Sequence, residues 1–111
     1  MFQRSRQGAI DIISGGEPLT GDFVELAKET LMSCVGEGQP KVVFDLQEVA
    51  LVNSSGMEML LDVKDACEER AGVLKLAAPG QLVADIFDAT GVSEALEVYP
   101  DLKSAVGSFL Q

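Results

Sequence analysis

One short segment of the sequence combines amide and hydroxyl side chains in a pattern that could support chemistry. Its residues, in chain order, are Asn53, Ser54, Ser55, Gly56, Met57 and Glu58. The segment follows an apolar stretch and precedes a helical pattern, and modification sites collect at such ends of α/β sheets. The first turn of a helix offers free backbone N–H groups and a partial positive charge. A phosphate on Ser54 would therefore lie in a favourable field, and it would add about −1.5 to −2 charge to the surface.

A structural role explains the same serines. Serine is a favoured N-cap residue because its side-chain oxygen accepts a hydrogen bond from a backbone N–H. Ser55 and Glu58 match the S-x-x-E capping box, in which the two residues satisfy backbone N–H groups at the start of a helix. Spacing alone favours capping, with a functional hydroxyl as the alternative. The two roles are compatible if Ser55 is the cap and Ser54 is the modified residue.

The remaining composition argues against an enzyme, a cofactor or a metal site. The chain has no histidine, which excludes imidazole bases and His-ligated metals. Cys34 and Cys67 form no CxxC motif and are predicted to be reduced core residues. Gly15 and Gly16 are interpreted as a turn, since no phosphate-loop or dinucleotide-binding motif surrounds them. A row of carboxylates on the second helix is interpreted as a solvated face: Asp62, Asp65, Glu68 and Glu69.

Length and charge favour a protein-binding domain. The 111 residues correspond to one domain, and a hydrophobic content of 47% suffices for one modest core. The 18 acidic and 8 basic residues give a net charge of −10, which disfavours nucleic acid and favours a partner protein with a basic face. No apolar run approaches the roughly 20 residues of a membrane span, and the basic start lacks the apolar stretch of a signal peptide. We therefore expect a cytoplasmic protein without membrane insertion.

Strand and helix patterns alternate along the chain. Strands are expected at 9–13, 41–46, 73–77 and 97–99, with a further edge strand before Gly8. Helices are expected between 22 and 36, between 56 and 72, between 80 and 91, and from 100 to 109. This alternation implies an α/β fold with a mainly parallel sheet, covered by helices through right-handed crossovers. We expect residues 1–111 to form a single domain.

The helix patterns also predict finer details. Asp22 and Glu25 resemble a capping box at the start of the first helix, with Thr20 as the alternative start. Gly72 is placed to cap the end of the second helix. The predicted apolar face of the first helix consists of Phe23, Leu26, Ala27, Thr30, Leu31 and Cys34.

Two stretches of the chain together resemble the STAS-domain anti-sigma-factor antagonists. The first is 42–46, an apolar strand ending in Asp-Leu, followed by 53–60, which is similar to the family's D-S-[ST]-G and apolar helix. The second extends from Gly72 through 74–76 to Thr90 and Gly91. The resemblance covers about residues 41 to 109. It implies a single small STAS-type domain with a mixed central sheet of four to five strands and about four helices.

The resemblance implies a bacterial regulator of transcription that works by partner switching and has no catalytic activity. In that family the unphosphorylated antagonist binds an anti-sigma factor, which is a serine kinase, and thereby frees the sigma factor. The kinase phosphorylates the first serine of the motif and the complex dissociates, until a PP2C-type phosphatase restores it. On this chain the implied phosphoacceptor is Ser54. The implied contact surface consists of Asn53, Ser55, Gly56 and Met57.

The chain departs from the family pattern in two places, of which the first is the best support for an alternative and the second implies an altered part of the partner surface. Asn53 stands where the family usually has Asp, and residues 16–22 differ from the usual G-x-[LI]-D before the first helix. The alternative is a non-phosphorylated STAS subunit or scaffold of a larger complex, such as a lipid-transport ABC system. A small-molecule-binding or enzymatic α/β domain is the third reading, which the absence of histidine and of nucleotide motifs disfavours.

Overall fold

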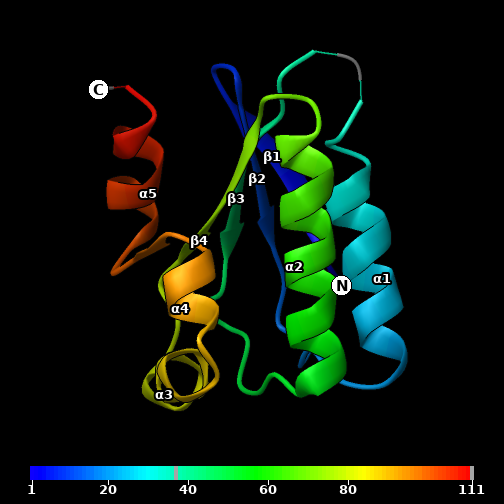
Figure 1. Ribbon diagram of the computed structural model, residues 1–111, viewed down its shortest axis with the longest axis vertical. Coiled ribbons are helices and arrows are strands. Elements are labelled where there is room, and N and C mark those ends of the chain that lie inside the picture. The colour runs from blue at the N-terminus through cyan, green and yellow to red at the C-terminus, as the bar shows by residue number, and fades with distance from the viewer. Residues whose placement is uncertain (37, 111) are drawn as a thin grey trace.

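The computed structural model describes residues 1–36 and 38–110, and it shows a sheet with helices on both faces (Figure 1). The strands are β1 (Gln3–Gln7), β2 (Ile10–Ser14), β3 (Lys41–Asp45), β4 (Val73–Ala77) and β5 (Val98–Tyr99). The helices are α1 (Asp22–Met32), α2 (Ser54–Glu68), α3 (Gln81–Thr90), α4 (Val92–Ala95) and α5 (Leu102–Ser108). The predicted α/β fold is therefore confirmed, with α4 as an additional short helix.

The sheet is mixed, as expected. Its strand order is β1-β2-β3-β4-β5, with β1 antiparallel to β2 and the other pairs parallel. The predicted edge strand before Gly8 is β1, which a two-residue turn joins to β2. Central β3 is apolar on both faces because helices cover both: Val42, Val43 and Phe44 are completely buried.

The two faces of the sheet carry cores of different size. α1 and α2 lie on one face, and α5 lies on the other (Figure 1). The larger core includes Phe44, Leu31 and Leu60, whereas the smaller core includes Ile12, Val43 and Val106. Within the described residues, no helix is both long enough and apolar enough to cross a membrane.

The α5 face also contains a buried lysine, Lys75 of β4. Its ammonium donates a hydrogen bond to Ser108 Oγ at 2.6 Å and lies 4.2 Å from the ring centroid of Phe109. Both partners belong to the end of α5, so these polar and cation–π contacts attach that end to the sheet.

The start of α1 differs from the prediction. Its N-cap residue is Gly21, which provides no side-chain cap, so the Asp22–Glu25 capping box is wrong. Phe23 and Leu26 are 39% and 51% exposed, so the buried stripe is narrower than the apolar pattern. The stripe consists of Ala27, Leu31 and Cys34, which face α2 and the sheet.

The predicted role of Gly72 is also wrong. The C-cap of α2 is Glu69, and Ala71 takes the left-handed conformation, with φ of 57°. A Cβ at Gly72 would overlap the carbonyl oxygen of Pro40 and lie 2.5 Å from its Cδ. Glycine is needed here because two backbones approach closely.

The remaining side-chain predictions concern the cysteines and the carboxylates of α2. Cys34 and Cys67 are free and buried, as expected. The four acidic residues of the α2 row are all exposed. In the described part of the chain, no cluster of three or more potential metal ligands occurs.

Candidate functional site at the start of helix α2

The loop before α1 fixes the approach to the candidate site. Leu19 N–H donates to the carbonyl of Leu51 at 2.9 Å, and Asn53 N–H donates to the carbonyl of Leu19 at 3.2 Å. These bonds form an isolated parallel bridge between Leu19 and Val52, both of which are buried. The chain therefore stays extended up to Asn53 and starts the helix immediately afterwards.

Asn53 caps α2. Its backbone is extended, and its Oδ1 accepts a hydrogen bond from the N–H of Gly56 at 3.0 Å. Its carbonyl accepts the N–H of Met57 at 3.0 Å, which starts the helical pattern. The helix therefore begins at Ser54, and the predicted Ser55–Glu58 capping box is wrong because Ser55 is already the second helical residue.

The predicted site residues lie together but differ in exposure. Asn53, Ser54 and Ser55 are exposed, Met57 is half-buried and Gly56 is buried. Among the described residues, neither serine hydroxyl makes a hydrogen bond that would hold it against the protein. Both hydroxyls are therefore accessible to another protein.

Close packing accounts for the glycine in this segment. A Cβ at Gly56 would lie 2.6 Å from the carbonyl oxygen of Leu19 and 3.0 Å from Cγ1 of Val52. Any larger residue would push the start of α2 away from the loop that positions it. Gly56 thus fixes the site through the backbone.

The end of α3 also reaches the site, through a residue that the sequence did not single out as part of it. The hydroxyl of Thr90 lies 3.3 Å from Sδ of Met57 and donates to the carbonyl of Ile86 at 2.7 Å. Thr90 comes 33 positions after Met57. The one sequence signal for Thr90 is the Thr-Gly pair at the end of a predicted helix. That pair does not indicate that Thr90 contacts the start of α2.

The electrostatics at the start of α2 favour an anion. The first turn contains no acidic residue, so no carboxylate of that turn neutralises the positive end of the helix dipole. Asn53 occupies one backbone donor, that of Gly56, and the N–H groups of Ser54 and Ser55 precede it in the same turn. An anionic group on Ser54 would experience this field at close range.

Comparison with known families identifies the fold. The family model described as the STAS domain matches residues 4–105. The chain belongs to the STAS-domain family. This STAS domain has no match among curated proteins, so its relatives are recognised through the family model and through solved structures.

The solved structures that this STAS domain resembles include anti-sigma factor antagonists. One from Mycobacterium paratuberculosis is 19% identical with a TM-score of 0.88, covering 100% of this chain and 94% of that one. The antagonist SpoIIAA in its unphosphorylated form is 19% identical with a TM-score of 0.79, covering 98% and 96% of the two chains.

A membrane transporter contains a similar domain. The murine anion transporter Slc26a9, in its inward-facing state, is 20% identical with a TM-score of 0.75. The match covers 88% of this chain but only 17% of the transporter. At these identities the likenesses show a shared fold, and a shared fold does not by itself assign a function.

Proposed function

We propose that this STAS domain is an anti-sigma-factor antagonist that binds an anti-sigma serine kinase and is released when Ser54 is phosphorylated. The observation that carries the proposal is the exposed position of Ser54, the first residue of a 15-residue helix without an acid in its first turn. The proposed molecule is a single non-enzymatic domain over residues 1–111, acting in a bacterial cytoplasm.

The modification is a phosphoryl transfer from ATP that the partner kinase catalyses. The bond between the γ-phosphorus and the bridging oxygen breaks, Ser54 Oγ bonds to phosphorus, and ADP leaves. The hydroxyl proton passes to a base of the kinase. Hydrolysis of the phosphoserine by a PP2C-type phosphatase returns the hydroxyl and inorganic phosphate. The antagonist provides only the acceptor oxygen, consistent with its lack of histidine.

A phosphate at Ser54 acts on docking more than on folding. The added charge of about −1.5 to −2 is compatible with the start of α2 because of the helix dipole. A kinase surface that fits the neutral hydroxyl would instead have to accommodate a charged group at the centre of the interface. Phosphorylation is therefore expected to dissociate the complex while the domain stays folded.

Asn53 is compatible with this role although the family usually has Asp there. Its amide oxygen caps the N–H of Gly56, which an Asp carboxylate would do in the same way. The substitution keeps the helix start and removes one negative charge beside Ser54. In the proposed interface Asn53 and Ser55 flank the acceptor, Gly56 permits the close packing and Met57 forms the half-buried border.

Phosphate incorporation tests the proposal. We expect intact-mass analysis to show one added phosphate after incubation with a candidate anti-sigma kinase and MgATP. Ser54→Ala should abolish the addition, while the matched variant Ser55→Ala, one residue further along the same exposed turn, should retain it. Ser54→Asp should weaken kinase binding without loss of the folded circular-dichroism spectrum. Unchanged incorporation in Ser54→Ala would show that the acceptor has been misassigned.

A second candidate function is a non-phosphorylated subunit of a larger assembly. The similarity to the domain of an anion transporter and the uncharged Asn53 favour it. One example of such an assembly is a lipid-transport ABC system, in which this domain would be the accessory subunit. Copurification from native membranes with a transport ATPase, without phosphate on Ser54, would support this candidate over partner switching.

A further inference from the structure

Within residues 1–36 and 38–110, the outer edge of the sheet is open along β1. All five residues of β1 are exposed, and β2 is the strand that pairs with them. In an antiparallel pair, alternate backbone N–H and C=O groups point away from the partner strand. The outer edge of β1 therefore presents hydrogen-bonding groups to which another strand could add.

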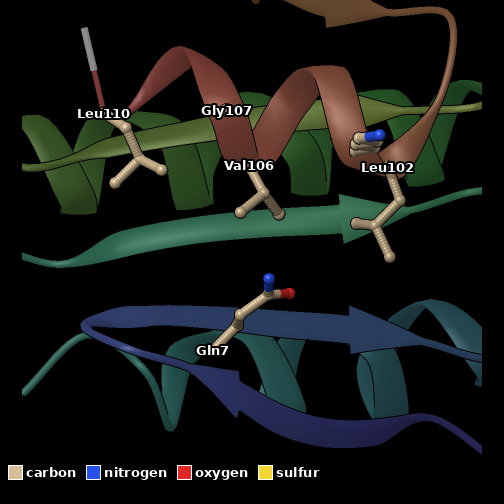
Figure 2. Close-up of a pocket in the computed structure, with 6 residues that line it drawn as sticks. Gln7, Leu102, Val106, Gly107 and Leu110 are labelled. Atoms are coloured by element: carbon tan, nitrogen blue, oxygen red, sulfur yellow. The ribbon is translucent and has the colours of Figure 1, made fainter.

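Two apolar grooves flank this edge. The first, of about 450 Å³, lies between the start of the chain and α1, and its lining includes Phe2, Phe23 and Leu26. The second, of about 500 Å³, lies between α5 and β1, and its lining includes Gln7 and Leu110. Figure 2 shows Gln7 pointing from the sheet toward the side of α5 that carries Leu102, Val106 and Leu110.

The spacing of the two grooves matches the geometry of a strand. Phe2 and Gln7 are five residues apart, and side chains alternate between the faces of a strand, so an odd separation places them on opposite faces. One groove faces α1 and the other faces α5, in agreement with this alternation. An extended segment paired with β1 would therefore direct one side chain into each groove, about 17 Å apart.

The charge of β1 indicates what kind of extended segment could pair with its outer edge. Among the side chains that the structure describes, Arg4 and Arg6 share one counterion, Asp11, at 3.1 Å and 3.5 Å. Asp11 is 5% exposed, whereas the side chain of Arg6 is 61% exposed. Across residues 1–36 and 38–110, one carboxylate thus pairs with two guanidinium groups, which leaves a local excess of positive charge on the edge of a chain with a net charge of −10.

The same charge disfavours pairing with a second copy. An antiparallel pair of β1 strands centred on Ser5 would place Arg4 opposite Arg6 of the other copy, twice. Like charges directly opposite one another destabilise a strand pair. An occupant with acidic side chains at these positions would instead form cross-strand ion pairs.

We propose that β1 binds an extended segment of a protein partner by strand addition. The segment carries acidic side chains opposite Arg4 and Arg6, and one apolar side chain for each flanking groove. Main-chain hydrogen bonds supply the affinity, and the grooves and guanidinium groups select the sequence. No residue of this site belongs to the contact surface proposed around Ser54.

A designed peptide tests the site on the full chain. The probe is acetyl-Leu-Glu-Thr-Glu-Thr-Leu-amide, which in antiparallel pairing places both Glu residues opposite the arginines and one Leu in each groove. The matched control replaces both Glu with Lys. We expect the Glu peptide to slow amide hydrogen exchange within 3–7 and to bind at least tenfold more tightly than the Lys peptide.

Charge reversal in the protein completes the test. Arg6→Glu should weaken the Glu peptide at least tenfold and strengthen the Lys peptide, whereas Arg70→Glu, the same change on an exposed residue beyond α2, should alter neither. Binding without protection of 3–7, equal protection by both peptides, or no binding at millimolar peptide would overturn the proposal. Concentration-dependent dimers that protect 3–7 without peptide would show that a second copy occupies the edge instead.

Discussion

Asn53 holds the start of α2 through its side-chain oxygen, which accepts the N–H of Gly56. Asn53→Ala should therefore lower the free energy of unfolding by about 1 kcal/mol, the usual cost of losing an N-cap. Asn53→Asp should cost nothing, because a carboxylate caps equally well and interacts favourably with the helix dipole. Urea unfolding followed by circular dichroism measures both changes.

Ser55→Ala is the control for this prediction. Ser55 is exposed and lies inside the helix, so its replacement should change stability by less than about 0.5 kcal/mol. If Ser55→Ala lowered the free energy of unfolding as much as Asn53→Ala, the assignment of Asn53 as the N-cap would be wrong.

At this scale the sequence predicted a helix start in this segment but not its capping residue. Asn53 and Ser55 are both favoured N-cap residues, and the S-x-x-E match pointed to Ser55. The choice depends on the bridge between Leu19 and Val52, which keeps the chain extended as far as Asn53. That bridge joins residues 33 positions apart, and no local pattern reports it.

At the scale of the elements, one close contact involves α2, β3 and β4. Gly72, in the connection from α2 to β4, packs against Pro40, which directly precedes β3. Gly72→Ala would place a methyl group against the Pro40 backbone, which neither strand can relieve without moving. We expect it to lower the free energy of unfolding by about 1–3 kcal/mol, the usual range for overpacking. Thermal and urea unfolding measure the loss.

Gly36→Ala is the matched control for that substitution. A Cβ there would meet no atom within 4 Å, and Gly36 does not require a positive φ. Its effect on the free energy of unfolding should stay below about 0.5 kcal/mol. Equal effects of the two variants would refute close approach as the reason for glycine at position 72.

Sequence periodicity predicted the helices and strands themselves. It did not predict how much of each apolar face the neighbouring elements bury. Helical spacing placed Phe23 and Leu26 on the same face as Leu31, yet they are exposed while Leu31 is buried. α1 lies at the border of the molecule, so α2 and the sheet cover only part of its apolar stripe (Figure 1). The width of a buried stripe depends on neighbouring elements, which the spacing within one helix does not reveal.

For the whole molecule, alternation of strands and helices was enough to predict an α/β fold with a largely parallel sheet. The position of α5 was not predictable in this way, because it depends on contacts between segments far apart in the chain. Lys75 shows why: a charged residue in a predicted buried strand is accommodated by Ser108 and Phe109, 33 and 34 positions later. Its role becomes visible only when α5 is placed on the sheet.

The free energy of unfolding of the whole molecule should fall at alkaline pH because a thiol is buried in the core between α1 and α2. Burial, with smaller contributions from Cys34 and Glu68, raises the pKa of the Cys67 thiol from 9.0 to about 11. Below pH 9 the thiol is protonated in both folded and unfolded chains. Between pH 9 and about 11 the unfolded chain loses this proton while the folded chain keeps it, so unfolding is favoured increasingly as pH rises.

Two pKa units correspond to a loss of about 2–3 kcal/mol from this group as pH rises from 9 to 11. Urea unfolding at several pH values between about 8 and 11 should show this loss in the wild type. Cys67→Ala is the reference: its stability is lower at every pH because of the cavity, but it lacks the Cys67 contribution to the slope of stability against pH. Parallel stability curves for the two proteins would show that Cys67 ionises equally well in the folded core.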